Sequence, residues 1–279
     1  MLKKQNIKSI AFIFAVCVFF AGAVRGQESS ETVQSKKERI EAERVWEQMV
    51  KVRGGRDKLH SISNILLTKG INADSVQIEL YVYPNRYWEW SRNKALRDSL
   101  WITMANLDTG VFVVVEHETL VANRHKLSEA ERTNYRESYL IAACRFLLET
   151  KWLRPTPIRV TRKKLGKEQV DVVETRFTTL SEYKNWRVDF YIDPESLVVK
   201  GVENYGDDEI AGRYTSFQGY TTVEGIDVPQ KFGVSLSIKD FSKIYYSSLS
   251  FRFNVDYDKR LFETSPSMNA GPDAWKSKN

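Results

Sequence analysis

Cysteine and histidine are scarce in this 279-residue chain, which argues against a disulfide-rich scaffold and against a histidine-based metal site. The chain has two cysteines, too few for a disulfide-stapled scaffold. It has three histidines, none at the helical two-histidine spacing of zinc proteases. Nucleophile-elbow and phosphate-loop patterns are missing as well, so we expect no catalytic residues, no cofactor and no metal. A hydrophobic content of 42% with 12% aromatic residues excludes a disordered chain.

An excess of one charge is also lacking once the N-terminus is set aside. Residues 1–26 contain four cations and no acid, so the formal net charge falls from +6 to +2 without them. The remaining lysines and arginines are spread along the chain rather than clustered. Nothing in this distribution favours a nucleic-acid partner.

The N-terminus is typical of a secretory signal peptide over residues 1–26. Early lysines precede an apolar run over 10–20, and small residues follow at 21–26. We expect cleavage after Gly26, with a cut after Ala23 as the alternative. The apolar run is shorter than the roughly 20 residues that a membrane anchor needs. The chain is therefore predicted to be exported.

Cleavage leaves Cys144 as the one cysteine of the mature chain. It lies in the apolar run 140–144, where a small buried side chain is the favoured interpretation over a reactive thiol. The other cysteine, Cys17, lies inside the N-terminal apolar run in a poor context for lipid attachment. A lipoprotein is thus the weaker alternative to a cleaved signal.

Hydrophobic periodicity predicts two helices, a short helical turn over 56–60 and about ten strands. The first helix, 35–52, ends at a glycine pair. The second begins at Ser128 with a capping box, runs to 152 and is apolar nearly all round over 139–148, which predicts burial. The expected strands are 65–73, 75–82 continuing across a kink at Pro84 into 87–90, 96–106, 111–119, 158–165, 169–178, 186–192, 197–205, 211–221, 226–238 and 243–255.

This order of elements predicts an α+β, mainly β fold with one strongly curved antiparallel sheet wrapped around two or three helices. Alternation within 75–82 predicts one buried face. In the last strand, the residues expected to share one face are Tyr245, Leu249, Phe251, Phe253 and Val255. Residues 27–36 are expected to form a disordered linker and 265–279 a polar flexible tail.

Dense aromatic residues are the main functional indication, because a curved sheet around a helix can enclose an apolar pocket. Arg145 is the one charged residue among these apolar neighbours, and an unpaired buried charge is costly. Three interpretations are open: it pairs with a sheet carboxylate, it extends to the solvent at the rim, or it anchors the head group of a ligand. The candidate lining residues are Tyr81, Trp88, Trp90, Trp101, Tyr139, Ala143, Arg145, Phe146 and Leu147.

Several turn motifs resemble those of bacterial exported proteins related to the lipoprotein carrier LolA and its receptor LolB. They are VRGGRDKL at 52–59, YIDP at 191–194, YTSFQGY at 214–220, VEGIDVP at 223–229 and FNVD at 253–256. The resemblance implies an unclosed β-barrel of about eleven strands over residues 37–264. It also implies a periplasmic location, a hydrophobic cavity for acyl chains and no catalytic residues.

The favoured function is therefore a monomeric periplasmic protein that binds or carries a lipid, a lipoprotein acyl chain or another apolar ligand, with an envelope membrane partner as a further expectation. The alternative is a non-catalytic interaction module of the cell envelope with a filled core. A hydrolase is the third alternative, and it would need an acid or histidine cluster assembled by folding.

Overall fold

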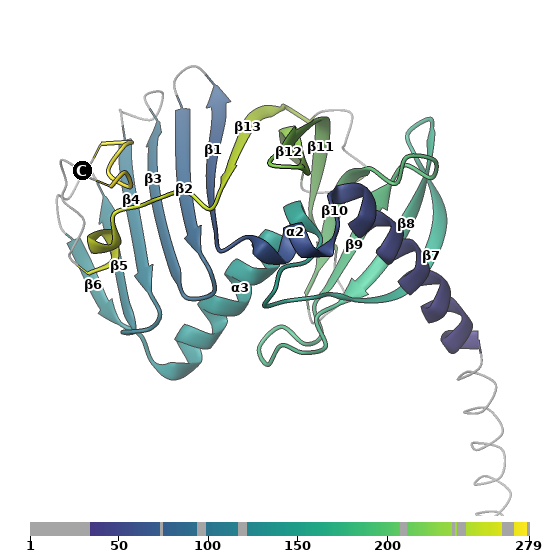
Figure 1. The fold of residues 1–279 in the computed structure, drawn as a ribbon, viewed down its shortest axis with the longest axis horizontal. Helices are drawn as coiled ribbons and strands as arrows, with labels where there is room; N and C mark the ends of the chain where they lie inside the picture. The colour runs from purple at the N-terminus through teal and green to yellow at the C-terminus, as the bar shows by residue number, and fades with distance from the viewer. Residues whose placement is uncertain are drawn as a thin grey trace, which may run out of the picture.

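The structure is a computed structural model that describes residues 34–72, 75–93, 99–116, 122–206, 211–235, 238, 244–263 and 271–277 (Figure 1). The predicted signal peptide lies outside the described residues, as does most of the predicted linker. Those predictions stay predictions.

Thirteen strands form one sheet in the described part of the chain, and every neighbouring pair is antiparallel. The first group is β1 (Asn64–Asn72), β2 (Ser75–Val82), β3 (Arg86–Asn93), β4 (Ser99–Asn106), β5 (Val111–Glu116) and β6 (Ala122–Lys126). The second group is β7 (Thr156–Leu165), β8 (Glu168–Arg176), β9 (Arg187–Ile192), β10 (Val199–Tyr205), β11 (Ala211–Val223), β12 (Ile226–Ser235) and β13 (Ser247–Phe253). The curved mainly β fold is confirmed, with more strands than predicted.

The additional strands have two origins. The predicted kink at Pro84 is wrong, because the chain reverses there and β3 pairs antiparallel with β2, with Val82 opposite Arg86. The polar strand β6 was not predicted, because its sequence has no apolar alternation to reveal it.

The sheet consists of two meanders that meet at β13. Its order is β6-β5-β4-β3-β2-β1-β13-β12-β11-β10-β9-β8-β7, so β6 and β7 are unpaired edges and the sheet is unclosed. We call β1–β6 the first half and β7–β12 the second half. Strand β13 pairs with β1 over Ile65 to Gly70 but with β12 only at Lys231 and Phe232.

Helix α3 (Glu129–Leu147) connects β6 to β7, which are opposite edges of the sheet. It must therefore cross the sheet, and Figure 1 shows it running diagonally over one face. We call this the inner face and the opposite one the outer face. The predicted capping box is present, since Ser128 Oγ accepts from the Glu131 amide at 3.3 Å and Glu131 accepts from the Ser128 amide at 2.8 Å.

Two further helices precede the sheet. The N-terminal helix covers residues 34–53 and packs Trp46 and Met49 into the inner core, and α2 (Arg56–Ser61) follows directly. Helix α3 ends at Leu147, earlier than the predicted residue 152, because Leu148 adopts a positive φ of 74° that leaves the helix. None of the helices in the described part of the chain combines the length and apolar character needed to cross a bilayer.

Both faces of the first half are covered. The chain after β13 forms the 3₁₀ helix η2 (Lys259–Phe262) and packs Phe262 and Trp275 against the outer face. The prediction of one buried face for 75–82 is therefore wrong, because Leu80 and Glu79, on opposite faces, are 0% and 3% exposed. Trp275 lies within the predicted flexible tail, yet it is 6% exposed and its carbonyl accepts from the Asp258 amide at 3.0 Å.

Three of the five residues predicted to share one face of the last strand lie there, whereas Val255, which follows β13, packs in the outer cluster with Phe262. Leu249, Phe251 and Phe253 are buried in the inner core. Tyr245 is 93% exposed, so its predicted place on that face is wrong. Tyr245 precedes β13, and outside a strand the alternation of side chains does not apply.

Candidate functional site

The inner face of the first half carries its side chains in rows that run across the strands. Residues directly opposite each other in antiparallel strands share a face. The row under α3 is aromatic and places Tyr81 opposite Tyr87. Tyr139 of α3 stacks on Tyr87 with ring centroids 4.8 Å apart, and Tyr135 stacks on Phe112 at 5.0 Å.

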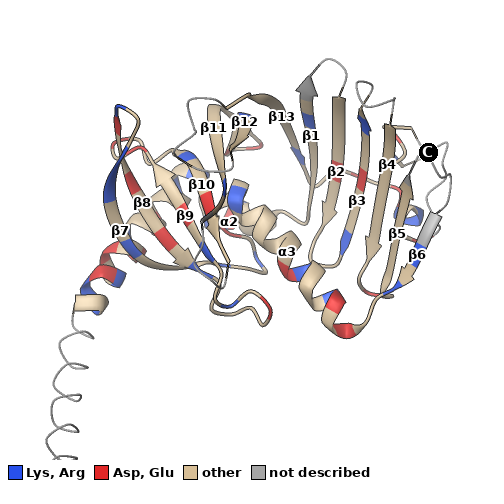
Figure 2. Cartoon of the chain, turned by 180° about the vertical axis from the view of Figure 1, so that it is seen from behind, with Lys and Arg blue, Asp and Glu red and all other residues tan. Residues whose placement is uncertain are grey.

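A row of carboxylates lies beside the aromatic row, with Glu79 of β2 opposite Glu89 of β3. In Figure 2 they are red bands on these two strands. Tyr81 donates to Glu79 at 3.1 Å and Tyr87 donates to Glu89 at 2.7 Å. Gln77 donates to both carboxylates, at 2.8 and 2.7 Å.

Burial and the neighbouring charges act in opposite directions on the pKa of the carboxylates in this row. Burial raises the pKa of Glu79, the Lys69 ammonium 2.6 Å away opposes that rise, and Glu89 adds to it. Burial, together with the neighbouring Glu79, also raises the pKa of Tyr81 well above its ordinary value. The tyrosine therefore stays a neutral donor, and the inner face combines an aromatic strip with a satisfied polar strip.

Farther along α3 the inner face is aromatic and apolar. Phe146 contacts Phe251 of β13 and Phe217 of β11, with ring centroids 5.4 and 5.7 Å apart. Phe146 is only partly buried, as are Tyr81 and Tyr139. Tyr81 and Phe146 pack against the same inner core, Tyr139 contacts Tyr81 with ring centroids 6.1 Å apart, and all three retain surface that a ligand could cover.

Arg145 lies next to Phe146 on α3 and is partly buried. Within the described part of the chain its guanidinium makes no hydrogen bond or ion pair, and its Nε is enclosed without an acceptor. Burial lowers the pKa of Arg145. Pairing with a sheet carboxylate, one of the alternatives for Arg145, is not seen.

The structure separates the nine candidate lining residues. Trp88 and Trp90 are on the outer face, where they pack with Phe262 and Trp275. This corrects their predicted place beside Tyr81: residues 88 and 90 alternate with Tyr87, so they point to the opposite side of β3.

The other strand tryptophan, Trp101, is on the inner face opposite Ser91, where it is 44% exposed. On α3, Ala143 and Leu147 are completely enclosed in the core, whereas Tyr139, Arg145 and Phe146 retain exposed surface. The residues brought together on the inner face are thus Tyr81, Tyr139, Arg145 and Phe146.

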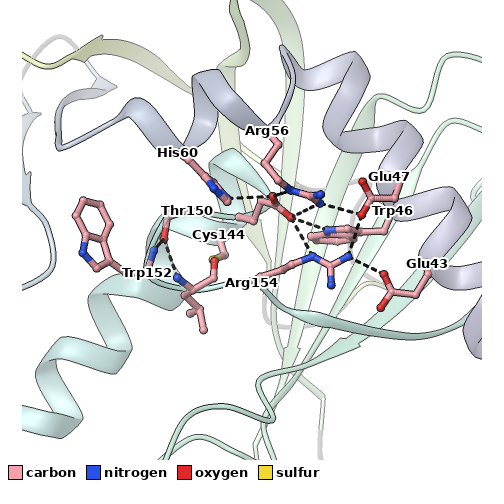
Figure 3. Close-up of polar contacts among 11 residues, drawn as sticks. Glu43, Trp46, Glu47, Arg56, His60, Cys144, Thr150, Trp152 and Arg154 are labelled. Carbon is pink, nitrogen blue, oxygen red and sulfur yellow. Dashed lines mark hydrogen bonds and ion pairs between the residues drawn. The ribbon is translucent and has the colours of Figure 1, made fainter.

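A second polar cluster, which we call the Glu149 cluster, was missed by sequence reasoning (Figure 3). The Glu149 side chain is fully buried directly after α3. Arg56 Nε donates to it at 2.6 Å, Trp46 Nε1 donates at 3.1 Å, and His60 Nε2 lies 3.2 Å away. Arg154 is 3.5 Å from the same carboxylate.

The Glu149 cluster joins the N-terminal helix, α2 and the end of α3. Burial alone would raise the pKa of the Glu149 carboxyl, but Arg56, Trp46 and Arg154 together hold it below its ordinary value. Arg154 also reaches Glu43 at 2.6 Å and Glu47 at 3.0 Å. Because Glu149 is saturated by these partners, its role is to fix the helices rather than to react.

Cys144 lies beside this cluster and is inert. It is buried, and its Sγ lies 3.7 Å from the Leu153 carbonyl oxygen. Burial raises the pKa of the thiol well above its ordinary value. The prediction of a small buried side chain is confirmed.

A cavity of about 500 Å³ lies away from these clusters, at one end of the second half. It is bounded by the β7–β8 turn, the β9–β10 turn and Tyr246, whose hydroxyl is 2.9 Å from Ser216 Oγ. Lys200 at its edge is already 3.4 Å from Glu168. Nowhere in the described residues do three or more histidine, cysteine or acidic side chains gather in a way that could hold a metal ion.

Comparisons with known proteins return structural likenesses. No protein-family model and no curated protein sequence matches the chain. A domain described as an outer membrane lipoprotein-sorting protein, from Vibrio parahaemolyticus, is 12% identical with a TM-score of 0.42, covering 78% of this chain and 97% of its own. A DUF1329 family protein from Desulfovibrio piger is 9% identical with a TM-score of 0.44, covering 80% and 98%.

A LolA superfamily protein from Nitrosomonas europaea is also similar, at 12% identity and a TM-score of 0.42, covering 77% of this chain and 96% of its own. The lipoprotein-sorting and LolA descriptions name the group that the turn motifs of this sequence resemble.

Proposed function

We propose that this chain is an exported, non-catalytic periplasmic protein that binds or carries an apolar ligand against the inner face of its unclosed sheet. The ligand class is a lipid or the acyl chain of a lipoprotein. Export rests on the predicted signal peptide over residues 1–26, and we expect the mature chain to act as a monomer.

One observation carries this proposal. Three inner-face aromatics, Tyr81, Tyr139 and Phe146, pack against buried apolar residues but are themselves incompletely buried. Ligand binding would complete their burial. Each square ångström of apolar surface removed from water contributes about 25 cal/mol, so covering about 200 Å² would contribute about 5 kcal/mol before the cost of association.

Native mass spectrometry of protein purified from the periplasm, with chemical identification of extracted lipids, tests the proposal. We expect a stoichiometric lipid adduct. Phe146→Arg should abolish the adduct, because it places a second cation among the inner aromatics. Tyr245→Arg is the matched control, since it adds the same charge at a residue that is 93% exposed.

A clean apo mass that persists after incubation with lipid vesicles would contradict the carrier function. The alternative, an envelope interaction module with a filled core, would then be favoured. Phe146→Gln, a milder change, serves if Phe146→Arg does not fold, and circular dichroism of each variant separates lost binding from lost structure.

A further inference from the structure

We propose that Arg145 binds the anionic head group of the ligand, so that the protein selects acyl chains ending in a carboxylate or a phosphate. This inference rests on the proposed function and specifies its ligand class. It depends on three features of the inner face: an unsatisfied cation, acids that are already occupied, and access from solvent.

The unsatisfied cation stands out against the other arginines of α3. Arg132 forms an ion pair with Glu129 one turn earlier, and Arg136 donates to Asn85 at 2.7 Å. Arg145 has neither kind of partner in the described part of the chain, and its Nε is enclosed without an acceptor. A guanidinium carries five donors and no acceptor, so a group that satisfies it must supply oxygen lone pairs.

The inner-face acids do not fill this need, because other donors already occupy them. Glu79 accepts from Lys69, Gln77 and Tyr81. Glu89 accepts from Gln77 and Tyr87. The sheet therefore provides a complete polar network that excludes Arg145, and the missing acceptor has to come from outside the described chain.

Arg145 keeps exposed surface next to an aromatic side chain of the same helix. The residue is only partly buried, and its neighbour on α3, Phe146, contacts Phe217 and Phe251 while keeping exposed surface of its own. A ligand whose chain covers Phe146 and Tyr81 would bring its terminal group to Arg145. The planar fork of the guanidinium matches carboxylate and phosphate oxygens, and a charge-assisted pair of this kind is stronger than a neutral hydrogen bond.

The test compares ligands that share a chain and differ in the head group. Binding of oleate, oleyl alcohol and 1-oleoyl lysophosphatidate to the full mature chain is measured by isothermal titration below their aggregation concentrations. We expect oleate or lysophosphatidate to bind about 10- to 100-fold more tightly than oleyl alcohol, as a hydrogen-bonded charge pair provides. The tighter of the two anions identifies the head-group chemistry.

Variants assign the preference to Arg145. Arg145→Gln should bring the anions to the affinity of oleyl alcohol while leaving the alcohol itself unchanged. Arg145→Lys should keep part of the preference. Arg132→Gln, which removes an α3 arginine that already has a carboxylate partner, should leave it intact.

Each outcome has a distinct meaning. Equal affinity of the wild-type chain for all three ligands would overturn the inference and leave the proposed function standing. No binding of any ligand would overturn the proposed function itself. The wild-type comparison needs no variant, so the inference remains falsifiable even if Arg145→Gln fails to fold.

Discussion

The two halves of the sheet each carry acidic residues aligned across neighbouring strands, seen as red bands in Figure 2. The pairing and the core clusters place the two rows on opposite faces of the sheet. In the first half the row is Glu79–Glu89 on the inner face. In the second half it is Glu174–Asp189–Glu203 on the outer face, and all three side chains are buried.

The rows differ in what satisfies them. The second-half row is paired by cations, with Arg159 2.9 Å from Glu174 and Arg187 3.1 Å from Asp189. The first-half row relies more on neutral donors: Glu89 accepts from Gln77 and Tyr87, whereas Glu79 also binds Lys69. Glu203 of the second-half row accepts from Tyr191 and Tyr205, each at 2.7 Å. In the first half, within the described part of the chain, the enclosed Nε of Arg145 has no acceptor.

The inner coverings of the halves differ as well. The second half is packed by the N-terminal helix and the end of α3, with Trp46 edge-on to Phe190 at 5.3 Å. The first half is covered by the tyrosines of α3, which keep exposed surface. The inner face of the second half is thus covered by buried helix side chains and that of the first half by partly exposed tyrosines, and the short β12–β13 ladder joins the two halves.

The largest loss of stability is expected at Glu149, whose cluster holds the helices that cover the second half. Glu149→Ala leaves Arg56, Arg154 and the Trp46 indole without their buried acceptor, and removing one partner of a buried charge cluster costs about 3–5 kcal/mol. Urea unfolding measures the loss.

The control is Glu41→Ala, which breaks only a surface pair with Arg44 and should not change the unfolding midpoint measurably. Because the partners of Glu149 hold its pKa low, the wild-type chain should lose this stabilisation as the pH falls through that value. Equal midpoints for Glu149→Ala and wild type would show that the cluster does not hold the helices.

The second effect concerns Asp189 and pH. Burial raises the pKa of Asp189 to about 6, with Arg187 opposing the rise and Glu174 adding to it. Between the unfolded value of about 3.9 and about 6 the folded chain holds a proton that the unfolded chain has released, so stability falls as the pH rises through this window. The whole change is up to about 3 kcal/mol, at 1.36 kcal/mol per unit.

Asp189→Asn should remove this slope, measured as the urea midpoint at several pH values from 4 to 7. Asp171→Asn, on the neighbouring strand and bound to Arg162, should keep it. A slope unchanged in Asp189→Asn would assign the proton uptake to another group.

The third effect tests the outer cover of the first half. Trp275→Ala removes an indole that is enclosed with Trp88 and Phe262, and we expect a loss of about 3 kcal/mol in urea unfolding, at the low end of the cost of removing a core tryptophan. Ligand binding should not change, since Trp275 is on the outer face. Lys276→Ala is the matched control and should lose much less stability than Trp275→Ala. Reduced lipid binding by Trp275→Ala would contradict the assignment of binding to the inner face.

Much of the fold was predictable because its rules are local. The strand β2 was predicted at its observed bounds, and the Ser128 capping box fixed the start of α3. The faces were less predictable: alternation tells which residues share a side, but not that a distant C-terminal segment covers the second side and buries Trp88. The reversal at Pro84 and the polar edge strand β6 gave no periodic signal.

The candidate site was predictable only in part, for the same reason. Arg145 could be singled out because a charge among apolar residues is locally visible. The Glu149 cluster could not, because Trp46, Arg56 and Glu149 are separated by up to 103 positions and meet only in three dimensions. The one available indication was an acid directly after a buried helix.

The smallest loss of stability is expected at Tyr246, which lies against the outer face of the second half. Tyr246 is only partly buried there, and its hydroxyl is 2.9 Å from Ser216 Oγ beside the 500 Å³ cavity. Tyr246→Phe keeps the ring and removes one hydrogen bond, so we expect a loss of about 0.5–1 kcal/mol in urea unfolding.

Ser216→Ala and the double variant complete a cycle that isolates the pair, and the double variant should lose little more than either single one. A loss in Tyr246→Phe as large as that in Trp275→Ala would make the two outer covers equivalent. The halves would then differ only on the inner face, where Arg145 and the partly exposed tyrosines lie. The proposed assignment of ligand binding to the first half would rest on that face alone.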